Sequence, residues 1–202
     1  MTGVTSGGRA EALLLYERTL GDRERVLGAD DPDTLLTRNN LALAYREAGR
    51  LDEAVSLSEK ALADCERVLG PDHVGTLISE SNLALAYRAA GRLEEAVVLL
   101  QRNVSTAERV LGSSHPRLAE SLRRLGQGKG ESGDLAAAAA ALGRAVDVDT
   151  AIYGPAHAQI VADLELLAVV QEQQGNADDA AASRAHAQRI REQKSPPGSA
   201  GE

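Results

Sequence analysis

The chain has 202 residues, a formal net charge of −8 and only 2% aromatic residues, with no Trp and no Phe. The negative charge argues against nucleic acid or an anionic membrane as the main partner. The scarcity of aromatic side chains excludes a platform on which nucleic-acid bases stack. The length suits one sizeable domain.

Cysteine usage and hydropathy indicate a cellular compartment. Cys65 is the only cysteine, so an internal disulfide is excluded and a reducing compartment is favoured. We interpret Cys65 as a small apolar residue inside a helix. The sequence has no apolar run of the length needed for a signal peptide or a transmembrane span. These features predict a soluble, cytoplasmic protein, and the abundance of Arg and Ala is typical of a GC-rich bacterial genome.

The first predicted helix lies at residues 9–27, after a segment at residues 1–8 that is rich in Gly, Ser and Thr and is expected to be disordered. This helix matches the second helices of the repeats described below, and its own first-helix partner is missing. We therefore expect an uncovered apolar edge at Leu13, Leu14, Leu15 and Tyr16. Two explanations are open: further repeats precede it, or the edge, with Leu13, Leu14 and Tyr16, forms a homodimer interface.

The remainder of the chain repeats with a period of 42 residues. The stretch NNLALAYREAGRLDEAVSLSEKAL at residues 39–62 returns as SNLALAYRAAGRLEEAVVLLQRNV at residues 81–104. Small residues keep this spacing in three sets: Gly28, Gly70, Gly112 and Gly154; Gly49, Gly91, Gly133 and Gly175; Ala54, Ala96, Ala138 and Ala180. A period of this length indicates a solenoid. The array is predicted to comprise a half repeat at 9–28, full repeats at 29–70, 71–112, 113–154 and 155–194, and a disordered tail at 195–202.

Each full repeat predicts a first helix, a glycine turn, a longer second helix and a loop. Pro32 and Pro116 stand at the first helical position, behind Asp31 and His115 as N-caps. The turn glycines are expected in the left-handed conformation. Second helices are predicted at 51–69, 93–111, 135–153 and 177–193, which gives nine helices and no strand. The third repeat should be the most labile, because its first helix contains Gly126, Gly128 and Gly130.

The pattern of Tyr45, Gly49, Ala54 and Ala61 resembles the tetratricopeptide repeat. The 42-residue unit, with NNLALAYREAGR and ERVLGPDH, is similar to the kinesin light chain variety, which many bacterial regulatory and scaffold proteins carry. The resemblance implies an all-α, right-handed solenoid of antiparallel helix pairs whose first helices line a concave groove for an extended peptide. It also implies that Asn40 and Asn82 bind the backbone of the ligand. This series of asparagines ends after two repeats, because Arg124 and Leu166 stand at the equivalent positions.

Helical spacing points to the same face. Leu36, Asn40, Leu43 and Glu47 form one stripe of the first helix, and Leu41, Ala42 and Tyr45 form a more apolar stripe that should pack in the core. The predicted groove therefore consists of Asn39, Asn40, Leu43, Arg46, Asn82, Leu85, Arg88, Arg123, Arg124 and Gln127. An amide both donates and accepts hydrogen bonds, and arginine binds carboxylates, so the predicted partner is a protein or peptide that is acidic or ends in a free carboxylate. The alternative is that Asn40 and Asn82 bridge neighbouring helices and that Arg46 and Arg88 form a solvated face.

The patterns that suggest an enzyme have simpler explanations. His73, His115 and His157 recur at 42 residues, but equivalent loops lie about 10 Å apart, too far for their side chains to converge on one metal ion. We therefore predict that they cap helices. The run GQGKGES lacks the first glycine of a phosphate loop, since Arg123 stands there. We predict no enzyme, no metal and no cofactor, and favour a protein-binding scaffold over a self-assembly module or the sensor part of a larger bacterial regulatory protein.

Overall fold

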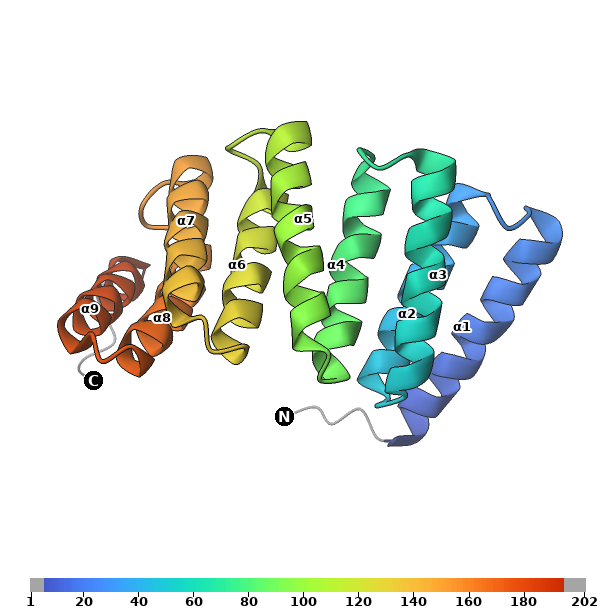
Figure 1. Ribbon diagram of the computed structural model, residues 1–202, viewed down its shortest axis with the longest axis horizontal. Coiled ribbons are helices and arrows are strands. Elements are labelled where there is room, and N and C mark those ends of the chain that lie inside the picture. The colour runs from blue at the N-terminus through green and yellow to red at the C-terminus, as the bar shows by residue number, and fades with distance from the viewer. Residues whose placement is uncertain (1–5, 195–202) are drawn as a thin grey trace, which may run out of the picture. The chain divides into compact units, whose positions relative to one another are not determined.

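The computed structural model describes the backbone of residues 6–194 and the side chains of residues 11–193. This part of the chain contains nine α-helices and no strand, as predicted (Figure 1). The helices are α1 Ser6–Val26, α2 Pro32–Glu47, α3 Leu51–Leu69, α4 Val74–Ala89, α5 Leu93–Leu111, α6 Pro116–Glu131, α7 Leu135–Tyr153, α8 Ala158–Gln173 and α9 Ala177–Lys194. Residues 6–8, expected to be disordered, belong to α1. The disorder predicted for residues 1–5 and 195–202 lies outside the described residues.

The first helices begin at a side-chain cap. The carboxylate of Asp31 accepts a hydrogen bond from the amide of Asp33 at 2.9 Å, with Pro32 at the first helical position. A histidine replaces this aspartate in the later repeats, and its Nδ1 accepts the equivalent bond: His73 from Gly75 (3.0 Å), His115 from Arg117 (3.1 Å) and His157 from Gln159 (3.2 Å). The capping role predicted for the three histidines is confirmed.

Glycines with positive φ follow both kinds of helix. The predicted left-handed turns after the first helices are confirmed, with φ of 77° at Gly49, 76° at Gly91, 86° at Gly133 and 82° at Gly175. The loops after the second helices begin in the same way, for example at Gly70 with φ 90° and ψ 162°. Only glycine adopts that conformation readily, which explains the second series of glycines at 42-residue spacing.

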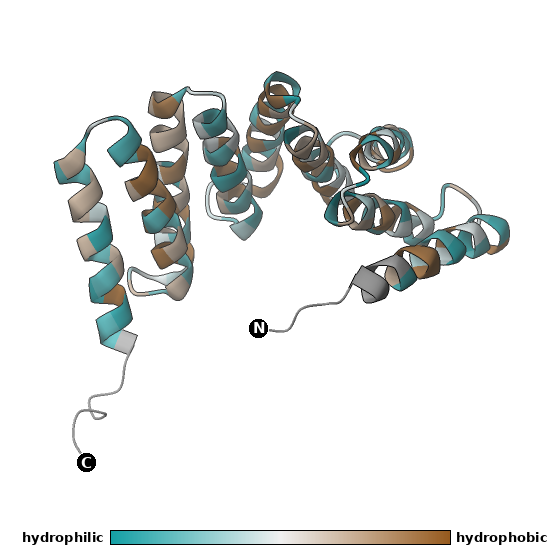
Figure 2. Cartoon of the chain, turned by 90° about the horizontal axis from the view of Figure 1, so that it is seen from below, coloured by the Kyte–Doolittle hydropathy of each residue, from teal (hydrophilic) through white to brown (hydrophobic). Residues whose placement is uncertain are grey.

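Where the sequence suggested one domain, the chain forms two compact units, Met1–Leu99 and Leu100–Glu202. Contacts in a repeat array join neighbours only, so an array has no single centre. In unit 1, Leu13, Leu20 and Leu41 form one buried cluster, and Ala54, Val55 and Ala86 form another. In unit 2 the clusters are Ala138, Leu142 and Val170, and Ile160, Leu164, Ala187 and Ile190. Apolar and polar residues alternate along the helices (Figure 2).

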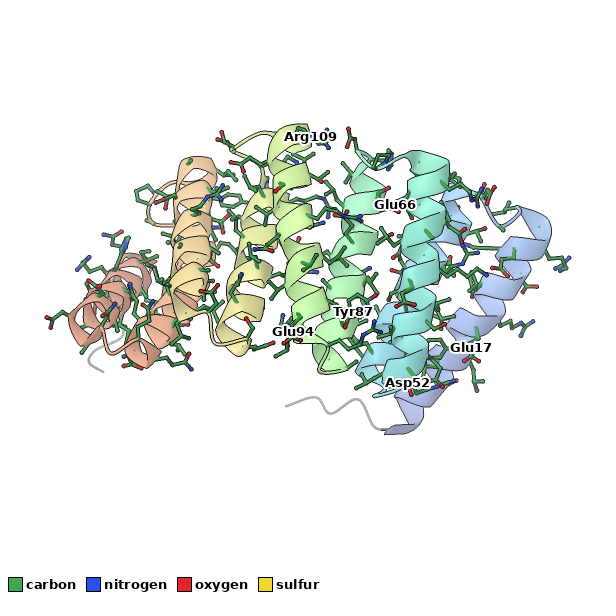
Figure 3. All side chains as sticks on the ribbon, in the orientation of Figure 1. Glu17, Asp52, Glu66, Tyr87, Glu94 and Arg109 are labelled. Atoms are coloured by element: carbon green, nitrogen blue, oxygen red, sulfur yellow. The ribbon has the colours of Figure 1, made fainter. Side chains whose placement is uncertain are left out.

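In unit 1, a tyrosine of each first helix donates a hydrogen bond to a glutamate of the second helix before it. The hydroxyl of Tyr45 on α2 donates to Glu17 on α1 at 2.7 Å, and the guanidinium of Arg50 lies 4.4 Å from the centre of the tyrosine ring. The next repeat copies this arrangement with Tyr87, Glu59 and Arg92, at 2.8 and 4.2 Å (Figure 3 labels Glu17 and Tyr87). Burial, together with the bond to the carboxylate, raises the pKa of both tyrosines.

Candidate protein-binding site

Two asparagines and two leucines occupy equivalent positions on α2 and α4. Asn40 and Leu43 lie on α2, and Asn82 and Leu85 lie 42 residues later on α4. All four side chains are half-buried, and the two helices contact each other within unit 1. We call these four residues the asparagine face. Leu36, one turn before Asn40, adds an apolar side chain that is 50% exposed.

The side-chain amides of this face, those of Asn40 and Asn82, have no hydrogen-bond partner in the described part of the chain. The alternative considered above, in which the pair bridges neighbouring helices through hydrogen bonds, is therefore not what the structure contains. Each amide offers a donor and an acceptor side by side, which matches the C=O and N–H of an extended peptide.

Asn39, also predicted for the groove, is buried, so its assignment was wrong. Its side chain is 4% exposed and donates to the hydroxyl of Ser79 on α4 at 2.8 Å. The same amide nitrogen lies 3.9 Å from the sulfur of Cys65 on α3. Asn39 therefore joins three helices of unit 1 from the inside. One residue along a helix corresponds to a rotation of about 100°, and this rotation separates the buried Asn39 from the accessible Asn40.

Arg123 stands in the register of Asn39 and is likewise not a groove residue. Its guanidinium lies 3.0 Å from the carboxylate of Asp149 on α7 and also binds Asp163 on α8. The two acids are 1% and 0% exposed. Burial and the adjacent Asp163 raise the pKa of Asp149 to about 6, and Arg123 opposes this shift. An ionic cluster in unit 2 thus takes the position of the neutral Asn39 contact in unit 1.

The remaining predicted groove residues interact within the protein. A guanidinium nitrogen of Arg46 lies 4.0 Å from Glu47, and Arg124 pairs with Glu120 one turn earlier. Arg88 and Gln127 also interact with other groups of the chain. The role of these four residues in binding stays a prediction.

The predicted apolar edge is only partly exposed. Leu13 is 8% exposed and packs against Leu20 and Leu41, so its assignment to the edge was wrong. Leu14 and Tyr16 are 66% and 38% exposed. Tyr16 and Leu15 line a pocket of about 450 Å³ between α1 and α2.

Neither a metal centre nor a membrane span is found among the described residues. Among them, no group of three or more His, Cys, Asp or Glu side chains is placed to hold a metal ion. None of the described helices combines the length and apolarity that crossing a bilayer requires.

The chain is similar to known repeat proteins. A family model described as "Tetratricopeptide repeat" matches residues 6–63, 34–102 and 80–151. No curated protein sequence matches. A solved structure of a Podosopora anserina kinesin light chain protein with nearly identical TPR-like repeats is 27% identical, with a TM-score of 0.82 over 94% of this chain and 90% of that one.

More distant structures share the fold. BtubC (BKLC) from P. vanneervenii is 24% identical, with a TM-score of 0.82 over 97% of this chain and 80% of that one. MamA from Desulfovibrio magneticus is 19% identical, with a TM-score of 0.67 over 93% and 88%. These similarities confirm the predicted all-α solenoid class.

Proposed function

The chain belongs to the tetratricopeptide repeat family, with repeats of the kinesin light chain kind, and from this premise we propose that it binds an extended peptide of a partner protein along α2 and α4. Repeats of this family are protein-interaction scaffolds and are typically non-catalytic. The peptide would lie across the asparagine face of unit 1. Its side chains would contact Leu43 and Leu85.

The observation that carries this proposal is the pair of unbonded amides, Asn40 and Asn82. They are half-buried, repeat at 42 residues and lie on two helices in mutual contact. A half-buried amide without a protein partner gains the most from a ligand that supplies both a donor and an acceptor. In unit 2 the equivalent positions hold Arg124, which is paired with Glu120, and Leu166. The proposed site is therefore confined to unit 1.

The test begins with peptides selected from a random library displayed on phage, with the whole chain as bait. A selected peptide, labelled with fluorescein, is titrated with the wild-type chain and with the Asn40→Ala/Asn82→Ala variant. We expect the double variant to bind about 10-fold to 100-fold more weakly, since each lost hydrogen bond is worth about 1 kcal/mol. Its melting temperature should stay unchanged, because neither amide has a protein partner.

Asn176→Ala is the matched control, because Asn176 is an exposed asparagine in the turn before α9. Affinity that is retained in the double variant, or lost equally in Asn176→Ala, would contradict the proposal. A library that yields no binder would also contradict it.

We also propose that the peptide carries a carboxylate near Arg46 and Arg88, which follow the two asparagines by six positions. Amidation of the selected peptide's C-terminus, or replacement of its acidic residues by amides, should then weaken binding. The variants Arg46→Glu and Arg88→Glu should weaken binding of the acidic peptide more than that of its amidated form. Equal effects on both forms would rule out the preference for a carboxylate.

A further inference from the structure

One face of α1 is uncovered where the equivalent face of α3 and of α7 is covered. This face, which we call the vacant face, consists of Ala12, Tyr16, Thr19 and Arg23. The equivalent residues of α3, against which α2 packs, are at most 2% exposed: Ala54, Ser58, Ala61 and Cys65. The equivalent residues of α7, against which α6 packs, are also buried: Ala138, Leu142, Ala145 and Asp149. On α1, in contrast, Ala12 is exposed, Tyr16 is 38% exposed and the other two are half-buried.

The pocket of about 450 Å³ lies on the vacant face. All four residues of the face line it, and Leu15, Thr37 and Asn40 close its other sides. Leu15 is 65% exposed, whereas its equivalent Ala141 in α7 is 6% exposed. The hollow thus corresponds to the position that a first helix takes on α3 and α7.

The size of the residues indicates what this helix would present. In unit 2, Gly126 of α6 lies so close to Leu142 of α7 that a Cβ on the glycine would come within 2.6 Å of the leucine side chain. At the equivalent positions, α2 carries Ala42 and α3 carries the smaller Ser58. Ala84 and Ala168 stand in the same register of α4 and α8, although the second-helix register holds Leu100 and Arg184 there, so every first helix carries Gly or Ala at this position. Because Tyr16 stands in the register of Leu142, we expect glycine or alanine at the matching position of a helix that packs on α1.

The charge of Arg23 indicates a second residue of that helix. In the last repeat, Arg191 of α9 stands in the same register and pairs with Glu165 of α8. Arg23 donates to the carbonyl of Asp33 at 2.8 Å and to the hydroxyl of Thr37 at 2.7 Å, but has no carboxylate partner among the described residues. A half-buried guanidinium without a counter-ion favours an acidic group nearby.

We propose that the vacant face binds an amphipathic helix of a partner protein that carries Asp or Glu three residues before Gly or Ala. This spacing is that of Glu165 and Ala168 in α8. The acid pairs with Arg23, the small residue packs on Ala12 and Tyr16, and the helix packs on α1 as α2 packs on α3. The proposal does not depend on peptide binding at Asn82, which is not part of this pocket.

The probe is a fluorescein-labelled peptide of residues 155–175, which contains α8 and is titrated with the full chain. We expect saturable binding that falls at least tenfold when the peptide carries Glu165→Lys or when the chain carries Arg23→Glu. Combining the two changes should restore affinity, because the charge pair is then reversed rather than broken. Leu14→Glu is the matched control on α1, since the equivalent positions Ser56, Val98 and Ala140 are exposed as well. Asn82→Ala should also leave affinity unchanged, because Asn82 lies outside the pocket, whereas Asn40 lines it and belongs to both surfaces.

The proposal is overturned if the charge reversals leave the affinity unchanged, or if no saturable binding is observed. Light scattering tests the second copy as occupant: a dimer that persists in excess peptide would mean that another chain covers the face, and would also overturn it.

Isolated helices of this length are only marginally stable in water, so a fused form provides a second test. Residues 155–174 are placed directly before Gly7, which stands in the register of the turn glycine Gly49. We expect a higher melting temperature than in the same fusion with Glu165→Lys in the added segment. Equal melting temperatures would contradict the proposal.

Discussion

Arg123 on α6 and Asp149 on α7 lie 3.0 Å apart in a cluster that holds two buried acids and one cation. Because burial disfavours the charged carboxylate and Asp163 lies beside it, Asp149 keeps its proton to a higher pH than a solvated aspartate, and its pKa is about 6. The native protein therefore binds this proton more tightly than the unfolded chain, in which the pKa of aspartate is about 3.9. The stability that this proton contributes is present below pH 4 and is lost as the pH rises through 6.

We predict that Asp149→Asn becomes more stable relative to the wild type as the pH rises from 4 to 7. The relative gain should be on the order of 1 to 3 kcal/mol, since one pKa unit corresponds to about 1.4 kcal/mol. Urea unfolding at both pH values measures it. Asp147→Asn, an exposed change on the same helix, should show no such trend. A stability difference for Asp149→Asn that is independent of pH would refute the explanation.

Glycines in α6 should respond in opposite ways to alanine. Gly126→Ala should lower the free energy of unfolding by about 1 to 3 kcal/mol, because the new Cβ would overlap Leu142. Gly130→Ala should raise it by about 0.5 to 1 kcal/mol, because its Cβ would have ordinary contacts of 3.9 Å and alanine favours helix. Thermal or denaturant unfolding measures both, and the same sign for both variants would contradict the packing described for Gly126.

Two arginines that bind the same acid should differ in their effect on stability. Arg38 is 1% exposed and pairs with Asp64 at 2.6 Å and with Glu24 at 2.7 Å. Arg67 is 56% exposed and lies 3.2 Å from the same Asp64. Arg38→Ala should cost about 2 to 3 kcal/mol, because it removes a buried guanidinium that binds two partly exposed carboxylates. Arg67→Ala should cost about 1 kcal/mol or less. Similar losses in denaturant unfolding would show that burial does not control these pairs.

Asn39→Ala and Asn40→Ala provide a contrast between adjacent residues. Asn39→Ala removes the donor to Ser79 inside unit 1 and should cost about 1 to 3 kcal/mol. Asn40→Ala removes no bond within the described chain and should stay within about 0.5 kcal/mol of the wild type. A similar fall in melting temperature for both would mean that Asn40 also stabilises the fold.

The sequence predicted the helices well because repetition supplies four versions of each signal. The Asp31 cap, the turn at Gly49 and the stripe of Leu41 and Ala42 all recur or have counterparts at 42 residues, and each reflects a local rule of the backbone. The start of α1 was the exception, since no copy of a first helix precedes it. A local rule could not show that α1 extends back to Ser6.

The candidate site was predicted less well, because it depends on which of two adjacent side chains faces inward. The stripe analysis separated Asn40 from Leu41 but left Asn39 between them. Its buried role depends on Ser79, a residue of another repeat. The same limit applied to Arg123, whose two acids come from α7 and α8. One signal was available: aspartates at 149 and 163 stand where earlier repeats carry Cys65 and Ser79.

The constant spacing of the turn glycines also bears on how such a chain can evolve. All four first helices that the structure describes have 16 residues, and α3, α5 and α7 have 19 each. Inserting a single residue in a helix would rotate everything beyond it by about 100°, and would move every later contact out of alignment. The gene can therefore lengthen by duplicating whole 42-residue units, after which each copy diverges through point substitutions such as those that separate Asn39 from Arg123.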